Sequence, residues 1–207
     1  EVIPRPELRI LAGRHPTGWA LYASNGEWQR ARHLEFLAEQ VMRLVSGEIR
    51  RLAISMPPRH GKSEFISKYL PTWWLGRDPS ARVVVCSYSV ALAKQWSRAA
   101  RDIFTEYSPE VFGGLHTRTY ASASDWPVLT RQGRPTGGGF YAVGRGGSLT
   151  GRGADLIILD DVLKDAAEAN SAAQRKHIWE WIQSVPFTRI EPGGRCVFVS
   201  TRWHFDD

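Results

Sequence analysis

A short apolar segment, a proline-containing turn and a Gly-Lys-Ser tripeptide follow one another in this chain, and that order constrains the fold more than any other feature. Residues 52–54 (Leu-Ala-Ile) have the pattern of a buried strand, and Pro57 and Pro58 cannot continue its hydrogen bonding. After the tripeptide, apolar residues recur at helical spacing up to Pro71, where we expect the helix to end. Strand, turn and helix form the setting in which a P-loop binds nucleotide phosphates.

The turn also supplies the side chains that a P-loop needs. Lys62 has the charge that pairs with β- and γ-phosphates, and the hydroxyl of Ser63 is a ligand for Mg²⁺. The sequence departs from the usual pattern at Met56, which stands where the first glycine is expected. Because a Gly-Lys-Ser tripeptide alone also occurs in ordinary loops, the prediction depends on the strand before it and the helix after it.

A second apolar segment ends in two acids, as the partner strand of a P-loop should. Four apolar residues, 156–159, precede Asp160 and Asp161, the pattern of a parallel strand buried on both faces. Ligands of open α/β sheets bind at the carboxyl ends of such strands. This predicts that Asp160 contributes to the Mg²⁺ shell and that Asp161 orients or deprotonates the attacking water. Taken alone, the segment is equally typical of a core strand followed by an acidic helix cap.

Strands and helices alternate along the rest of the chain. Strands are expected at residues 51–55, 82–87, 140–143, 156–160 and 195–200, and amphipathic helices at residues 32–45, 89–107 and 171–185. This alternation predicts an α/β fold of the RecA-like P-loop NTPase class, a mostly parallel sheet with helices on both faces. The length of the chain suits one domain over residues 1–207, with a helical lead-in over about residues 1–48 and a core over about 49–207.

The composition of the chain limits the binding partners and the cellular compartment that we expect for this domain. The formal net charge of +6 favours polyanions such as nucleic acid, although proteins without such partners can also be basic. No apolar run reaches the roughly 18 residues that a membrane span requires, so no membrane partner is expected. Cys86 and Cys196 each lie in an apolar strand-like segment, which predicts buried free thiols in a reducing compartment.

Three motifs in this order resemble the ATPase motor domain of the large terminase subunit of tailed bacteriophages, the enzyme that packages viral DNA. They are Met56-Pro-Pro-Arg-His-Gly-Lys-Ser-Glu64, Thr150-Gly-Arg-Gly-Ala-Asp155 with the acidic strand that follows, and Ser200-Thr-Arg-Trp-His204. The resemblance spans nearly the whole chain and implies hydrolysis of ATP with Mg²⁺ as cofactor. The residues implied to bind ATP in the first motif are Pro57, Pro58, Arg59, His60, Gly61, Lys62, Ser63 and Glu64.

The resemblance also implies roles that spacing alone does not supply. Ser200, Thr201 and Arg202 match the motif that couples ATP hydrolysis to movement, and Arg59 would contact phosphate oxygens or orient the loop. Each has a simpler explanation: a turn cap for the serine and threonine, a surface ion pair for Arg202, and a solvent-facing side chain for Arg59.

Terminase motors act as rings and use an arginine from a neighbouring subunit to stabilise charge on the transferring phosphoryl group. Arg152 is the candidate for this catalytic role, with Arg145 as the second choice. The glycines around both suit a loop that reaches across an interface, and they suit a disordered surface loop equally. Gln29 and His33 are the groups near the first helix that could contact adenine, where a plain helix start is an equal explanation.

The implied setting is the packaging of DNA into an empty procapsid in the cytoplasm of the host cell. The expected partners are double-stranded DNA, a portal protein, a small terminase subunit and further copies of this chain, as a pentamer on the capsid and a monomer alone. Terminases normally carry a nuclease domain after the motor. Because this chain begins at Glu1 and ends at Asp207, and because Asp206 and Asp207 suit a motor or linker segment, we expect a fragment that hydrolyses ATP without cutting DNA.

Two other functions fit parts of the pattern. A helicase-like nucleic-acid remodelling ATPase would share the fold and would need further motifs in a second motor domain. A non-catalytic DNA-binding module with a vestigial P-loop would bind DNA without turning over ATP.

Overall fold

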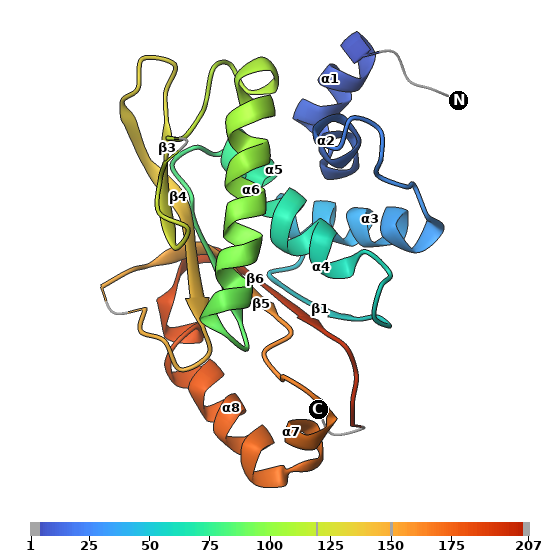
Figure 1. The fold of residues 1–207 in the computed structure, drawn as a ribbon, viewed down its shortest axis with the longest axis vertical. Coiled ribbons are helices and arrows are strands. Elements are labelled where there is room, and N and C mark those ends of the chain that lie inside the picture. The colour runs from blue at the N-terminus through green and yellow to red at the C-terminus, as the bar shows by residue number, and fades with distance from the viewer. Residues whose placement is uncertain (1–4, 119, 150, 205–207) are drawn as a thin grey trace.

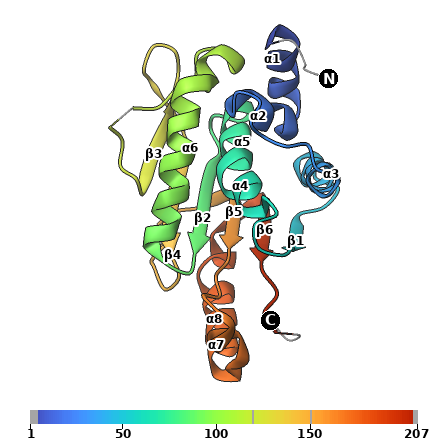
Figure 2. The same ribbon diagram turned by 45° about the vertical axis from the view of Figure 1, so that its right-hand side comes forward.

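The computed structural model describes residues 5–118, 120–149 and 151–204. The described strands form a six-stranded sheet in the order β1-β6-β5-β2-β4-β3. β3 runs antiparallel to β4, and the other neighbouring pairs are parallel. Figure 2 shows β2, β5, β6 and β1 side by side in this order. The strands are β1 (Arg51–Ser55), β2 (Arg82–Ser87), β3 (Asp125–Leu129), β4 (Pro135–Gly144), β5 (Ala154–Asp160) and β6 (Ile190–Ser200).

Helices cover both faces of this sheet (Figure 1), which confirms the predicted fold class. One face packs against the helices that precede or follow β1 and β2, and the other face packs against a helix pair inserted between β5 and β6. The helices are α1 (Arg5–Arg14), α2 (Pro16–Ala23), α3 (Arg32–Ser46), α4 (Lys62–Glu64), α5 (Leu70–Arg77), α6 (Val90–Val111), α7 (Ala166–Asn170) and α8 (Ala172–Ser184). Among the described residues, no helix combines the length and the apolar character that crossing a membrane requires.

Alternate residues of the central strands enter two separate cores, because successive side chains of a strand point to opposite faces. In β2, Val83 and Val85 belong to the core that also contains residues of α3, α5 and α6, whereas Val84 and Cys86 belong to the core that contains residues of α8. Cys86 and Cys196 are both buried and free, as predicted. Burial raises the pKa of the Cys196 thiol to about 11.

The helix after the P-loop does not end at Pro71, so this prediction was wrong. Helical structure continues through Pro71 to Arg77 by way of a π-helical turn, Phe65–Tyr69. Proline lacks an N–H and its ring crowds the carbonyl four residues earlier, which here belongs to Ser67. In the wider turn, the N–H of Leu70 donates to the carbonyl of Phe65, so the backbone passes the proline without a break.

The antiparallel edge strand β3 was not predicted. It contains Pro127, and proline is tolerated in a sheet at an edge, where a missing donor costs no ladder hydrogen bond. Its partner β4 begins earlier than predicted and includes the Gly137–Gly139 run. A Cβ at Gly138 would lie 2.3 Å from the carbonyl oxygen of Pro79. The glycine run therefore permits close approach of two backbones.

Candidate functional site

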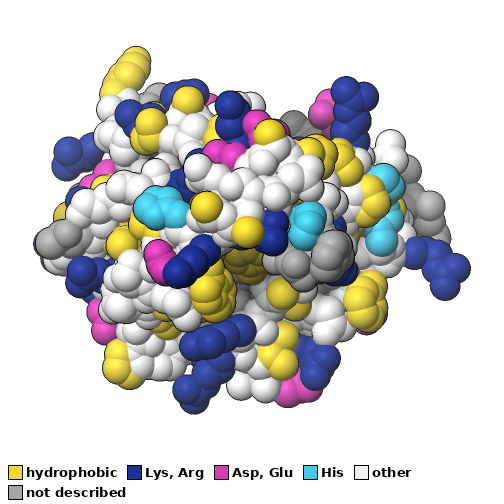
Figure 3. Space-filling model, turned by 90° about the horizontal axis from the view of Figure 1, so that it is seen from below, with side chains coloured by type: hydrophobic (Ala, Val, Ile, Leu, Met, Phe, Trp, Pro, Cys, Tyr) yellow, Lys and Arg dark blue, Asp and Glu magenta, His cyan; other side chains and the backbone are white. Residues whose placement is uncertain are grey.

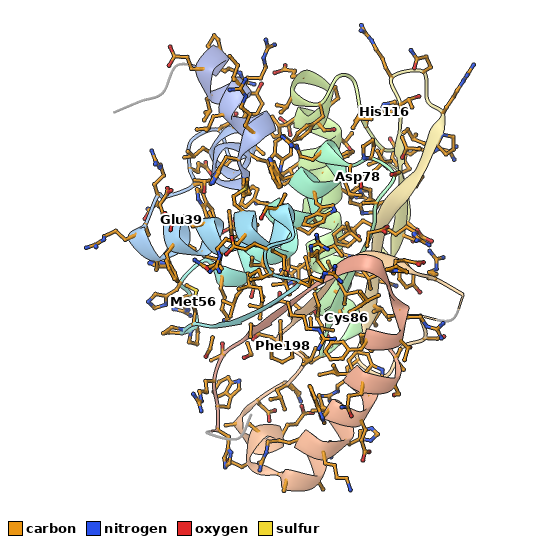
Figure 4. The ribbon with its side chains drawn as sticks, turned by 180° about the vertical axis from the view of Figure 1, so that it is seen from behind. Glu39, Met56, Asp78, Cys86, His116 and Phe198 are labelled. Carbon is orange, nitrogen blue, oxygen red and sulfur yellow. The ribbon has the colours of Figure 1, made fainter. Side chains whose placement is uncertain are left out.

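The parallel strands β1, β5 and β6 have their carboxyl ends on the same side of the sheet, and each overlaps or directly precedes one of the three sequence motifs. Met56 follows β1 directly and lies at its outer end (Figure 4). β5 ends at Asp160 and β6 ends at Ser200, which is paired in register with Ser55 at the end of β1. This carboxyl edge therefore brings together segments that are far apart in the sequence.

Lys62 opens the helix after the loop, and its side chain is almost fully buried. Its Nζ donates a hydrogen bond to Thr201 Oγ1 at 2.8 Å and lies 3.9 Å from Asp161 Oδ2. Only 5% of the residue is exposed. A buried ammonium is costly unless it is paired and hydrogen-bonded. Lys62 is thus aimed at the ends of β5 and β6.

Asp160 is a buried carboxylate held by two hydroxyls. Ser63 Oγ donates to Oδ1 and Ser67 Oγ donates to Oδ2, both at 2.8 Å. Burial raises the pKa of Asp160 to about 6, against the opposing effect of these hydrogen bonds. A carboxylate that is kept in this position despite the cost of desolvation is typical of functional sites.

This pair of oxygen groups fits Mg²⁺. The ion is commonly bound by one or two protein oxygens together with waters and substrate phosphates. The Ser63 hydroxyl and the Asp160 carboxylate are hard oxygen ligands in contact with each other. Within the described ranges, no group of three or more His, Cys, Asp or Glu side chains could form an all-protein metal cage. The residues present suit a metal that arrives with phosphate.

Asp161 has a strained backbone and a fixed carboxylate. Its φ is 45°, in the left-handed region, which Asp tolerates better than most residues. Its N–H donates to the carbonyl of Val199 at 2.9 Å, and its Oδ1 accepts the N–H of Thr201 at 3.0 Å. These bonds tie the end of β5 to the end of β6. They hold the Asp161 carboxylate beside Lys62, whose Nζ lies 3.9 Å from Asp161 Oδ2.

The loop after β1 has two residues in the left-handed region, and two histidines contact its backbone. Arg59 and Gly61 have positive φ values of 61° and 77°. His60 Nδ1 donates to the carbonyl of Pro58 at 2.8 Å, and His33 Nε2 of α3 donates to the carbonyl of His60 at 3.1 Å. His33 therefore contacts the loop backbone, a role that sequence reasoning did not assign to it.

A cavity of about 650 Å³ lies between this loop and the segment that joins α2 to α3. Its lining includes both residues predicted to contact adenine, Gln29 and His33, together with Arg59, His60 and Glu64 of the loop motif. The volume is in the range of small-molecule sites. Trp28, which stacks on Phe65 of the π-helical turn, forms part of its wall; sequence reasoning missed this residue.

The two candidate arginines lie at opposite ends of the parallel strands, one on the carboxyl side of the sheet and one on the amino side. Arg145 follows β4 at the carboxyl edge and makes a bidentate pair with Glu168, with both distances at 2.7 Å. This pair lowers the pKa of Glu168 to about 2. Arg145 also donates to the carbonyl of Val162 at 2.8 Å. Its guanidinium therefore bonds to Val162 and to Glu168 of α7 at the same time.

Arg152 precedes β5 and so lies at the amino edge. Its guanidinium donates to Asp125 Oδ2 at 2.8 Å and lies 4.2 Å from the centre of the Tyr141 ring. The seven residues of β5 separate it from Asp161 by about 20 Å. Arg152 therefore does not reach Asp161 of its own chain.

The remaining predicted residues lie as follows. Pro57 and Pro58 form the exposed turn after β1, and Arg202 contacts the backbone of His204 beyond β6. Thr150, Asp206 and Asp207 lie outside the described residues. Ser67, the second hydroxyl on Asp160, was missed, although its spacing of four from Ser63 places both on one helical face.

Figure 3 views the molecule from the end to which the strands of the sheet point. Lys and Arg side chains surround a hollow in which hydrophobic side chains are exposed. An apolar groove at the outer strands is lined by Trp179, Phe187 and Phe198, with Arg51 and Arg202 at its rim. This face carries positive charge next to the candidate site.

Two solved structures resemble this fold. The crystal structure of the HK97 bacteriophage large terminase matches with a TM-score of 0.55 and 14% identity over 84% of this chain and 34% of that chain. The large terminase ATPase domain of Thermus phage P74-26 matches with a TM-score of 0.49 and 18% identity over 73% of this chain and 59% of that chain. The chain therefore spans about a third of the HK97 chain, and at these identities the likeness shows the fold alone. No protein-family model and no curated protein matches the sequence.

Proposed function

We propose that this chain is the ATP-hydrolysing motor domain of a viral large terminase, which drives double-stranded DNA into a procapsid. One observation carries the proposal: Lys62, Ser63, Asp160, Asp161 and Thr201 lie at the carboxyl ends of the parallel strands, and each is within hydrogen-bond or ion-pair distance of at least one of the others. The fold likeness to the HK97 large terminase supports the same assignment.

In this proposal the triphosphate lies over the loop residues 57–63, with its base in the adjoining cavity. Lys62 Nζ pairs with the β- and γ-phosphates, and the backbone N–H groups of the loop donate to phosphate oxygens. Ser63 Oγ and the Asp160 carboxylate would hold Mg²⁺, which would supply positive charge against the phosphate oxygens. Arg59, exposed in the same loop and lining the cavity, lies where it can add a further cation.

Asp161 is the group that orients or deprotonates the attacking water. Its Oδ1 is fixed by the N–H of Thr201, so its Oδ2 is the oxygen available for that water. Arg152 of a neighbouring subunit completes the site by stabilising charge on the transferring phosphoryl group.

The partners follow from this role. We propose that the chain assembles as a ring, a pentamer on the capsid, with double-stranded DNA, a portal protein and a small terminase subunit, in the host cytoplasm. Packaging requires a grip on phosphates without base readout, so DNA binding should weaken steeply with salt. No nuclease activity is expected of these 207 residues, and metal-dependent DNA cleavage by them would contradict that expectation.

Steady-state ATP hydrolysis tests the proposal. We expect Lys62→Ala and Asp161→Asn each to lose at least about 100-fold of the rate, and Lys176→Ala, an exposed lysine on α8, to retain it. The wild-type rate should rise more than linearly with protein concentration. Mixing Arg152→Ala with Asp161→Asn should restore activity, because some sites then combine an intact Asp161 with an intact Arg152. DNA binding without any turnover, equal in wild type and Lys62→Ala, would instead favour a vestigial P-loop.

A further inference from the structure

Lys62 is engaged by groups of its own chain at the end of β6. Its Nζ donates to Thr201 Oγ1 at 2.8 Å and lies 3.9 Å from Asp161 Oδ2. The same Thr201 donates its N–H to Asp161 Oδ1 at 3.0 Å. Lys62, Asp161 and Thr201 thus form a closed cluster, with one residue from each of the three motifs.

When a triphosphate binds, the side-chain hydrogen bond of Thr201 to Lys62 is expected to break, whereas its main-chain hydrogen bond to Asp161 is expected to remain. Under the proposed function, on which this inference rests, Lys62 Nζ must turn toward the β- and γ-phosphates, whose combined charge exceeds that of the single carboxylate of Asp161. The hydroxyl of Thr201 then loses its donor. The N–H of Thr201 still holds Asp161, because that bond involves neither Lys62 nor the hydroxyl.

We propose that Thr201 and Lys62 form a latch, in which the threonine hydroxyl competes with the nucleotide phosphates for the lysine ammonium. Binding of a nucleoside triphosphate opens the latch, and the segment 200–202 reorients about its remaining bond to Asp161. The segment thereby senses the phosphates through Lys62 and not through direct contact.

Two substitutions separate the hydroxyl from the rest of the residue. Thr201→Val removes the hydroxyl and keeps the shape and the backbone N–H, whereas Thr201→Ser keeps the hydroxyl. We expect Thr201→Val to bind a fluorescent, non-hydrolysable ATP analogue with Mg²⁺ about threefold to tenfold more tightly than wild type, since one charge-assisted hydrogen bond no longer competes. Thr201→Ser should bind within about twofold of wild type. Thr188→Val, at an exposed threonine that bonds only to backbone carbonyls, is the matched control.

The direction in which Thr201→Val changes the affinity for the analogue tests the latch. Weaker or unchanged binding by Thr201→Val, with wild type binding normally, would overturn the latch and show that the hydroxyl holds Lys62 in its binding position. A wild-type chain that binds no nucleotide would contradict the proposed function and the latch together. Amide hydrogen exchange adds a second measurement: residues 200–204 should exchange faster with the analogue in wild type and show no such change in Thr201→Val. Equal exchange with and without the analogue in wild type would also overturn the latch.

Discussion

The two serines on Asp160 provide the sharpest prediction, because they make similar hydrogen bonds and have different roles. Ser67 is fully buried and donates to Oδ2, whereas Ser63 is partly exposed and donates to Oδ1. We expect Ser67→Ala to lower stability more than Ser63→Ala, and Ser63→Ala to lower ATP hydrolysis more than Ser67→Ala.

The magnitudes follow from burial. Ser67→Ala leaves one oxygen of a carboxylate that is 1% exposed without its donor, and such a loss costs about 2 kcal/mol. For a chain of this size that corresponds to a fall in Tm of about 4–8 °C. At Ser63 water can replace the lost hydroxyl, so the cost should stay below about 1 kcal/mol. The loss of a donor should also raise the pKa of Asp160 further above its ordinary value.

The effect on hydrolysis should have the opposite order. Ser63→Ala removes a proposed ligand of Mg²⁺, for which we expect a loss of about 100-fold or more in kcat/KM. Ser67 orients Asp160 without touching the metal, and the loss of such a positioning contact should cost about tenfold. Denaturant unfolding at pH 7.5 and steady-state phosphate release measure the two quantities on the same preparations.

Ser184→Ala, at an exposed serine at the end of α8, is the control and should match wild type in both assays. The reasoning would be refuted if Ser67→Ala were within about 0.5 kcal/mol of wild type, the usual range of surface substitutions. It would also be refuted if Ser63→Ala destabilised the fold more than Ser67→Ala, since burial would then not determine the cost.

Three further predictions concern other parts of the molecule. Glu168→Gln should lower the free energy of unfolding by about 1 kcal/mol at pH 7. Because Arg145 lowers the pKa of Glu168 from 4.5 to about 2, the difference in unfolding free energy between the variant and wild type, measured in urea, should shrink as pH falls between these values. A difference that persists unchanged at pH 2 would contradict the pairing. His33→Ala should weaken binding of the ATP analogue about threefold to tenfold by loosening the phosphate loop, and His33→Gln, which can still donate, should restore it; equal losses would argue against a bracing role. Cys86 and Cys196 should react with a thiol reagent only upon unfolding, and fast labelling of the folded chain would contradict their burial.

Much of the fold could be predicted because apolar runs and the residues that end them lie close together in the sequence. β1 and β2 have the bounds that were predicted, since charged residues precede both runs and loop residues follow them. β3 could not be predicted in this way. Its five residues include Pro127, which argues against a strand unless the strand is known to lie at an edge, and edge position is a property of the assembled sheet.

The site was partly predictable for a similar reason. Motif spacing placed Lys62 and Asp160 at one edge of a sheet, because parallel strands have their carboxyl ends together. Spacing did not show that Thr201 would contact Lys62, since the two are separated by 139 positions and the contact depends on the register between β1 and β6. The contact of His33 with the loop backbone was likewise invisible, because a sequence places a residue near a loop without specifying which atom it meets.

Every role proposed for this site depends on the binding of a nucleoside triphosphate by the loop at residues 57–63. Isothermal titration of the 207-residue chain with the non-hydrolysable ATP analogue, with and without Mg²⁺, tests this most directly. We predict one site per chain, tighter with Mg²⁺ than without, and a loss of affinity of at least about tenfold in Lys62→Ala. Equal affinity of wild type and Lys62→Ala, or no binding by wild type, would contradict the central claim.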